Sequence, residues 1–391
     1  MSTLLPAGSL PTLLDRAADP CGFARWHEQA RATGFCSRPV RLCGSTATVD
    51  GETGEVLVSY ATAGEPDGTL LIACGNRRVT RCPSCAETYR QDSFHLIAAG
   101  LRGGKGIPES VASHPRVFLT LTAPSFGAVH TLRGDGEVCR WRRSGDRCPH
   151  GVTRGCWRRH RADDEVLGQP VCPLCFDYER AVLWNAVAPE LWRRTTIAIR
   201  RQLAKVADIR VRQLNEHVRL RFTKVIEYQA RGVVHVHAVL RLDGPDPDVV
   251  RAPGPGWTVE LLEEAIRRAV AEVSAPLPSR DLEPDERAVW GTQVDLRPLP
   301  GSDGTAEAGE HLRGVAAYIA KYATKSTDPL GSLDRRLVRG EQIDELDINE
   351  HQRELVETAW QLGAEPHLAE LKLRHWAHTL GYRGHWATRS R

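Results

Sequence analysis

The stretch that decides the fold is Glu227-Tyr-Gln-Ala-Arg-Gly-Val-Val-His-Val-His-Ala-Val-Leu-Arg-Leu-Asp243. It reads as two extended runs joined by a turn at Arg231-Gly232. The second run alternates with period two, so His235 and His237 are predicted to project from one face of a strand. Glu227 would lie on the partner strand. Its carboxylate could then join both imidazoles around one metal ion and leave positions open for a substrate oxygen.

A His-x-His pair is weak evidence for a metal site when it is taken alone. The chain has 15 histidines in 391 residues, so such a pair arises by chance in roughly every second chain of this composition. A half-buried, hydrogen-bonded pair is the alternative interpretation. The remainder of the chain has to decide between them.

Composition indicates a soluble, cytoplasmic globular protein. Hydrophobic residues make up 41% and charged residues 26% of the chain, and no apolar run is long enough for a membrane helix. Without a signal for secretion, the 11 cysteines are expected to be thiols or metal ligands rather than disulfides. Eight arginines between Arg140 and Arg161 indicate a basic surface suited to a phosphate backbone, although an ordinary solvated surface is the alternative.

Two Cys-Pro-x-Cys motifs, at residues 82–85 and 172–175, predict structural Zn²⁺, because two thiolates at this spacing suit a tetrahedral ion. Buried reduced cysteines are the alternative. The grouping of ligands stays open. Either both motifs share one ion and residues 148–160 hold another, or each motif pairs locally. The candidate zinc ligands are Cys74, Cys82, Cys85, Cys148, His150, Cys156, His160, Cys172 and Cys175.

The order of predicted elements indicates an α+β fold. From residue 116 the order is β-α-β-β-α-β, which is typical of a ferredoxin-like (RRM-like) antiparallel sheet with helices on one face. Thr258 is the expected cap of the second helix, and Pro189 is expected to break the first. The strands are expected at 116–122, 219–229, 232–242 and 288–296, and the helices at 177–206 and 258–273.

A helix that carries two tyrosines is predicted after the sheet. Tyr318 and Tyr322 are four residues apart and share one face, with Lys321 and Lys325 on the neighbouring stripe. A packed aromatic pair with solvated lysines is the alternative. A phenol held above a metal can instead attack phosphorus and form a phosphotyrosine ester. A nearby ammonium would lower the phenol pKa and neutralise the developing charge.

With these residues the chain resembles the HUH endonucleases, and among them the rolling-circle replication initiators of actinobacterial plasmids and integrative elements (the RepSA type). Phe118-Leu-Thr-Leu-Thr122 is similar to the first motif of that family. His235-Val-His237 is similar to its metal motif, and Tyr318-Ile-Ala-Lys-Tyr-Ala-Thr-Lys325 to its two-tyrosine motif. The resemblance extends from about residue 74 to residue 386.

The resemblance implies site-specific nicking and rejoining of plasmid origin DNA, single-stranded or in a hairpin at the nick, through a 5′-phosphotyrosine intermediate. His235 and His237, with Glu227 as third ligand, would bind catalytic Mg²⁺ or Mn²⁺, and Tyr318 and Tyr322 would be the nucleophiles. No Gly-x-x-x-x-Gly-Lys-Ser/Thr string occurs in the sequence, so a host helicase and polymerase are the expected partners. Family chains are expected to extend somewhat beyond residue 391.

The expected organisation has four parts: an unassigned region at 1–73, a first zinc-knuckle segment at 74–115, an HUH nuclease domain at 116–330 and a C-terminal helical appendage at 331–391. A zinc-binding insertion interrupts the nuclease domain at about 139–178. Two alternatives to the initiator are a related HUH relaxase or single-strand transposase, and a non-catalytic, zinc-stabilised DNA-binding regulator. A covalent protein–DNA adduct separates the enzymes from the regulator.

Overall fold

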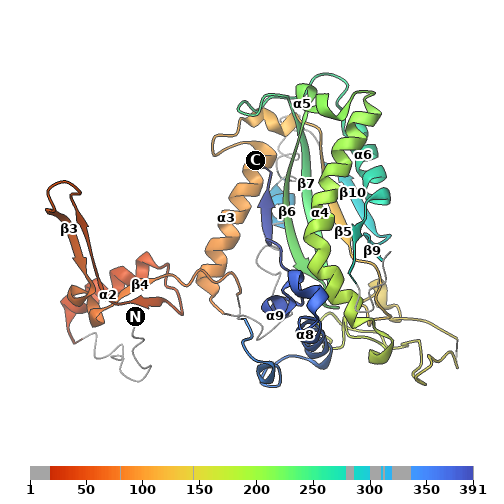
Figure 1. The fold of residues 1–391 in the computed structure, drawn as a ribbon, viewed down its shortest axis with the longest axis horizontal. Coiled ribbons are helices and arrows are strands. Elements are labelled where there is room, and N and C mark those ends of the chain that lie inside the picture. The colour runs from red at the N-terminus through yellow and green to blue at the C-terminus, as the bar shows by residue number, and fades with distance from the viewer. Residues whose placement is uncertain are drawn as a thin grey trace. The chain divides into compact units, whose positions relative to one another are not determined.

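The computed structural model describes residues 18–79, 81–143, 145–278, 286–299, 310, 313–318 and 336–390. It has two compact units, Met1–Asp92 and Ser93–Arg391. Helices and antiparallel sheets occur together (Figure 1), so the predicted α+β class is confirmed. Among the described helices, none has both the length and the apolar character needed to cross a membrane.

The first unit is built from short elements. Strands β2 and β3 form an antiparallel hairpin with its turn at Asp50-Gly51. The Asp50 carboxylate accepts hydrogen bonds from the backbone amides of Glu52 (2.9 Å) and Thr53 (2.7 Å) and so closes this turn. The elements are α2 (Pro20–Ala32), β1 (Val40–Leu42), β2 (Ser45–Val49), β3 (Val56–Ala61), β4 (Leu70–Ile72) and the first part of α3 (Pro83–Arg102).

The second unit is organised around a five-stranded sheet with the order β10-β5-β7-β6-β11, in which every neighbouring pair is antiparallel. The chain passes through β5-α4-β6-β7-α6-β10, which is the predicted order of elements. The edge strand β11 was not predicted, because three residues are too short to show a pattern. The strands are β5 (Arg116–Thr122), β6 (Arg219–Tyr228), β7 (Val234–Asp243), β10 (Val294–Pro298) and β11 (Ala387–Arg389).

Helices α4 (Tyr178–Val206) and α6 (Val259–Glu272) lie side by side (Figure 1) and share one hydrophobic core with the sheet. The predicted cap of α6 is confirmed, since the Thr258 hydroxyl accepts a hydrogen bond from the Leu261 amide (3.3 Å). The break predicted at Pro189 is wrong, because this proline lies inside α4, which is one continuous helix of 29 residues. Burial of a long apolar face offsets the roughly 3 kcal/mol that an internal proline costs.

The strand predicted at 288–296 is also partly wrong. The structure has a two-residue strand, β9 (Arg287–Ala288), and then β10, which begins at Val294. Between them the Gly291 amide donates to the carbonyl of Thr122 (2.7 Å), and a Cβ at this glycine would lie 2.7 Å from the Ala123 carbonyl oxygen. The close backbone approach therefore interrupts the run. The remaining elements are α5 (Leu214–His217), β8 (Ala275–Pro276), α8 (Glu350–Leu362) and α9 (Leu373–Trp376).

Asn185 connects α4 to the turn between β6 and β7. Its side chain is fully buried. The amide nitrogen donates to the carbonyls of Gly232 (2.9 Å) and Leu380 (3.0 Å), and the amide oxygen accepts from the backbone N–H of Val234 (3.0 Å). One side chain thus satisfies two backbone groups at the hairpin turn and a third at Leu380, and so joins the turn to the C-terminal part of the chain.

Replacing Asn185 with alanine is expected to lower the free energy of unfolding by about 2–4 kcal/mol, because buried backbone groups lose their partners. Urea titration followed by circular dichroism measures the change. Asn215→Ala is the matched control: Asn215 is exposed and accepts one hydrogen bond from Arg200, so its loss should stay within about 0.5 kcal/mol. Equal losses in both variants would contradict the role assigned to Asn185.

Candidate active site and metal clusters

The register of the central strands gathers the first candidate residues on one face of the sheet. Glu227 of β6 lies opposite His235 of β7. On the other side of β7, Thr120 of β5 lies opposite His237. Because directly opposed residues in antiparallel strands point to the same face, these four side chains lie together, as the predicted hairpin requires.

The two imidazole rings are stacked, with centroids 4.6 Å apart and planes inclined by 23°. Nδ1 of His237 lies 3.2 Å from the Thr120 hydroxyl, and its Nε2 lies 3.4 Å from a Glu227 carboxylate oxygen. Nδ1 of His235 lies 3.0 Å from the side-chain amide of Gln229. Each ring is therefore oriented through Nδ1, which is the usual arrangement for imidazoles that coordinate through Nε2.

The surroundings of His235 fit a metal ligand. Its Nε2 is buried and has no hydrogen-bond partner within the described part of the chain, and such an atom costs free energy unless something satisfies it. Burial, and then the nearby His237 and Arg231, lower the pKa of His235 to about 3. The ring is therefore neutral near pH 7, and neutral imidazole is the form that binds metal. Two nitrogens and one carboxylate suit Mn²⁺ better than Mg²⁺, which prefers oxygen ligands.

Tyr318 lies against this pair. Residues 313–318 are helical, and the Tyr318 ring meets His237 edge-on at 5.7 Å and Phe118 edge-on at 5.9 Å between centroids. The tyrosine is 44% exposed and borders a cavity of about 450 Å³. A substrate can therefore reach this face. The other residues of the two-tyrosine motif, Lys321, Tyr322 and Lys325, lie outside the described residues.

Among the residues that the structure describes, nine cysteines and three histidines form three clusters of four potential metal ligands. In each cluster the four donor atoms lie within 4.8 Å of one another. The first cluster is Cys36, Cys74, Cys82 and Cys85; the second is His130, Cys139, Cys156 and His160; the third is Cys148, His150, Cys172 and Cys175.

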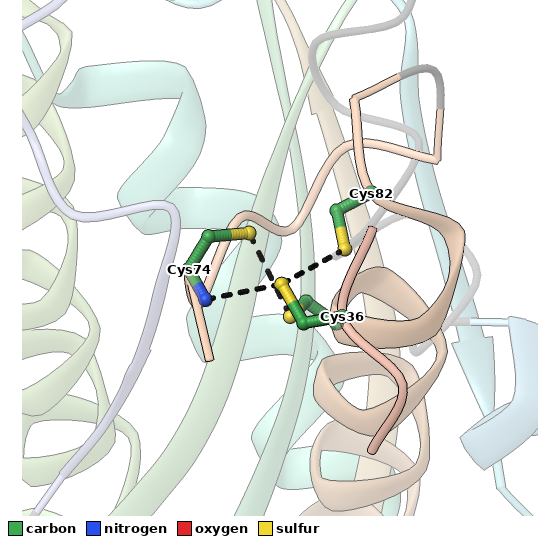
Figure 2. A group of neighbouring side chains, drawn as sticks. Cys36, Cys74 and Cys82 are labelled. Atoms are coloured by element: carbon green, nitrogen blue, oxygen red, sulfur yellow. Dashed lines mark hydrogen bonds between the residues drawn. The ribbon is translucent and has the colours of Figure 1, made fainter. Parts of the chain in front are cut away.

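The spacing of the donors suits zinc. Zn–S bonds of about 2.3 Å place two sulfurs of a tetrahedral site about 3.8 Å apart, whereas a disulfide would bring them to about 2.0 Å. The thiols of Cys36 and Cys82 are 3.6 Å apart, and those of Cys74 and Cys85 are 3.7 Å apart. Figure 2 shows the Cys36 sulfur facing Cys82 and accepting a hydrogen bond from the Cys74 amide (3.3 Å).

The first cysteine of two turns is tuned toward the thiolate. Burial alone raises the pKa of Cys82, but hydrogen bonds from Ser37, Ser84 and nearby backbone amides outweigh it and lower the pKa to about 5. In the same way the amides of His150 and Val152 outweigh desolvation and lower the pKa of Cys148 to about 6. Thiolate is the form of cysteine that binds metal, so one donor of each turn is close to that form. Burial instead raises the pKa of Cys74 to about 12 and that of Cys175 to about 11, so these thiols would lose their protons when an ion binds.

With this geometry established, comparison with known proteins identifies the family. The family described as "Replication initiator protein, pSAM2" (RepSA) matches residues 22–391. The chain belongs to the RepSA replication initiator family. A replication initiator protein of Streptomyces ambofaciens is 45% identical over 399 residues, an alignment that covers all of this chain and 81% of that relative. No solved structure matches the chain. The family resemblance expected from the motifs is therefore confirmed.

The clusters also decide between the two groupings of cysteines left open above. The shared arrangement is wrong, because each Cys-Pro-x-Cys motif completes its ligand set with residues of its own unit. Cys148 and His150 group with the second motif rather than with Cys156 and His160. Three potential ligands were missed. Cys36, His130 and Cys139 belong to no recognisable motif. Their residue type was the only sign in the sequence that they could bind metal.

The purified protein is expected to carry about three Zn²⁺ per chain, one for each cluster. Serine at Cys36, Cys139 or Cys172 should each lower the bound zinc by one equivalent, as measured by mass spectrometry of the metal. Cys21 and Cys43 are exposed and outside all three clusters. Serine at these two positions is the control and should leave the zinc content unchanged. Unchanged zinc in the cluster variants would contradict the assignment.

Proposed function

We propose that this RepSA initiator nicks and rejoins plasmid origin DNA through a covalent tyrosine intermediate. The observation that carries the proposal is the contact of Tyr318 with His237, which is stacked on His235. The strand order β10-β5-β7-β6, with α4 and α6 as the two connecting helices, supports a ferredoxin-like core of the HUH type. Family membership supports origin DNA as the substrate.

In the proposed reaction the Tyr318 phenol is the nucleophile. Its oxygen bonds to the scissile phosphorus while the bond from phosphorus to the 3′ oxygen breaks. The phenol gives its proton to water and the leaving 3′ oxygen takes one up from water to become a 3′-hydroxyl, so the protein keeps the 5′ phosphate as a phosphotyrosine. A Mn²⁺ or Mg²⁺ ion held by His235, His237 and Glu227 would polarise the phosphate as a Lewis acid.

The covalent intermediate keeps the energy of the phosphodiester. The free 3′-hydroxyl can prime a host polymerase, and a host helicase would separate the strands. Tyr322 is the proposed nucleophile for the second transfer, which ends the round. Lys321 and Lys325 would neutralise the charge that develops on the phosphorane. Hydrolysis would discard the bond energy, so the arrangement favours strand transfer.

Tyr318→Phe is expected to lower the rate of the first nick at least about a hundredfold, because the attacking oxygen is gone. Tyr322→Phe should leave the rate of the first nick unchanged and impair the second transfer, which ends the round. Supercoiled plasmid with a candidate origin and Mn²⁺ is the substrate, and nicked DNA attached to denatured protein is measured. Tyr89→Phe is the matched control, since Tyr89 lies in α3 and belongs to no proposed site; this variant should nick at the wild-type rate. If even the unaltered protein binds DNA without forming an adduct, the protein is a regulator. If it nicks DNA independently of the origin, it is a relaxase or transposase.

His237→Ala is expected to lower the rate of nicking at least about a hundredfold. The zinc content should stay at its wild-type value, because the catalytic ion is separate from the three clusters. His95→Ala is the control, as His95 is a histidine of α3 that belongs to no proposed site. Nicking is measured with Mn²⁺ and with Mg²⁺. Full activity of His237→Ala would contradict the proposed ligand set.

A further inference from the structure

We infer that the segment between β5 and α4, residues 123–177, binds single-stranded DNA next to the nicking site. Trp141 and Trp157 would stack on unpaired bases, and Arg142 and Arg143 would contact phosphates. The inference rests on the proposed function for the identity of the strand as origin DNA. It adds a binding surface outside the candidate active site.

Two tryptophans of this segment are exposed to solvent. Trp141 is 65% and Trp157 47% exposed, whereas Trp184 and Trp192 of α4 are 1% and 5% exposed. An added Cβ at Gly155 would lie 3.0 Å from Cβ of Arg142 and 3.3 Å from Cζ2 of Trp157, so an arginine and an indole flank one point of the surface. Exposed aromatic faces next to guanidinium groups are the combination that binds single-stranded nucleic acid.

The charge around these tryptophans is strongly positive. Arg142 and Arg143 are exposed and form no ion pair with any described residue. Asp146 is the one acidic residue between positions 140 and 161, and its carboxylate lies 3.8 Å from the Arg154 guanidinium. Arg158 and Arg161 pair with Asp164 (3.3 Å) and Asp163 (3.4 Å). The arginines of the same stretch are Arg140, Arg142, Arg143, Arg147, Arg154, Arg158, Arg159 and Arg161. Such a surface fits a phosphate backbone.

Two cavities that share Arg140 lie along this surface, one of them beside the end of the sheet. One, of about 620 Å³, is lined by Thr122 and Gln229 at the end of the sheet and by Arg140. The other, of about 690 Å³, is lined by Arg140, Trp141, Arg142 and Arg143. Gln229 contacts His235, and Arg140 borders both cavities. A strand that leaves the histidine pair past Gln229 would therefore meet Arg140 and then Trp141.

The second cluster anchors the backbone next to both tryptophans. Trp141 follows Cys139 by two residues and Trp157 follows Cys156 directly. The backbone of Arg140, which follows Cys139, pairs with the backbone of Cys156 through hydrogen bonds of 2.9 and 2.8 Å. The backbone that carries the two rings is therefore ordered before a strand binds, which lowers the entropic cost of binding. Duplex DNA covers its base faces by stacking, so an unpaired strand is the form that these rings can bind.

Fluorescence anisotropy with a labelled oligothymidine tests the inference, in a Tyr318→Phe, Tyr322→Phe background that removes covalent chemistry. Trp141→Leu with Trp157→Leu keeps apolar bulk but loses the aromatic faces, and is expected to bind at least about tenfold more weakly. Trp141→Tyr with Trp157→Tyr keeps aromatic faces and should bind within about threefold of the parent. Zinc content confirms that both variants hold their metal.

A second pair of variants tests the phosphate contacts independently. Arg142→Gln with Arg143→Gln should reduce the slope of log affinity against log salt by about 1.4, the value for two phosphates of a single strand. Arg267→Gln with Arg268→Gln, on the exposed face of α6, is the control and should leave the slope unchanged.

The outcomes separate this inference from the proposed function. If the wild-type chain forms no adduct but the leucine variant loses oligothymidine binding, the nicking proposal fails and the DNA-binding surface stands. If the adduct forms and the leucine variant binds oligothymidine as tightly as the tyrosine variant, the surface assignment is wrong. Preference of the parent for duplex over oligothymidine, with no effect of either tryptophan variant, would also overturn it.

Discussion

The candidate active site depends on the antiparallel register of β6 and β7. This register sets Glu227 opposite His235 and directs His237 to the same face. A slip of one residue would turn both imidazoles toward the core that α4 and α6 share with the sheet. The opposite face of β7 prevents the slip, because its side chains are fully buried in that core: Val234, Val236, Ala238, Leu240 and Leu242.

The other end of the sheet face that carries the histidines holds a network of charged side chains instead of potential metal ligands. Arg116 is fully buried and donates to backbone carbonyls of Leu101, Val111 and Ala112. Burial alone would raise the pKa of Asp243, but hydrogen bonds from His114 and Arg241 lower it. The ionised carboxylate therefore stabilises the fold above its ordinary pKa, and this contribution is lost as pH falls through the lowered value. His114, Arg241 and Asp243 thus pair with one another inside the protein.

The sequence was informative where a pattern repeats locally. Alternation around His235 predicted the strand and the shared face of the pair, and Thr258 predicted a helix start that the structure confirms. It failed where tertiary packing decides, as at Pro189, where the buried face of α4 overrides the proline. The ligand groups could not be read either. The second and third clusters alternate along the chain, and His130 and Cys139 are too far apart to form a motif.

That alternation has a structural consequence for the segment between β5 and α4. Its described residues form only short 3₁₀ turns and isolated β-bridges, and its buried side chains are largely the ligands themselves, such as Cys139, Cys148 and Cys156. A segment of this size cannot bury enough apolar surface to fold alone, so bound metal is the available substitute for a core. Because apolar side chains are then not needed inside, tryptophans and arginines can be placed outside. The same metals that would hold the segment together would thus leave its surface free for the DNA contact that we infer.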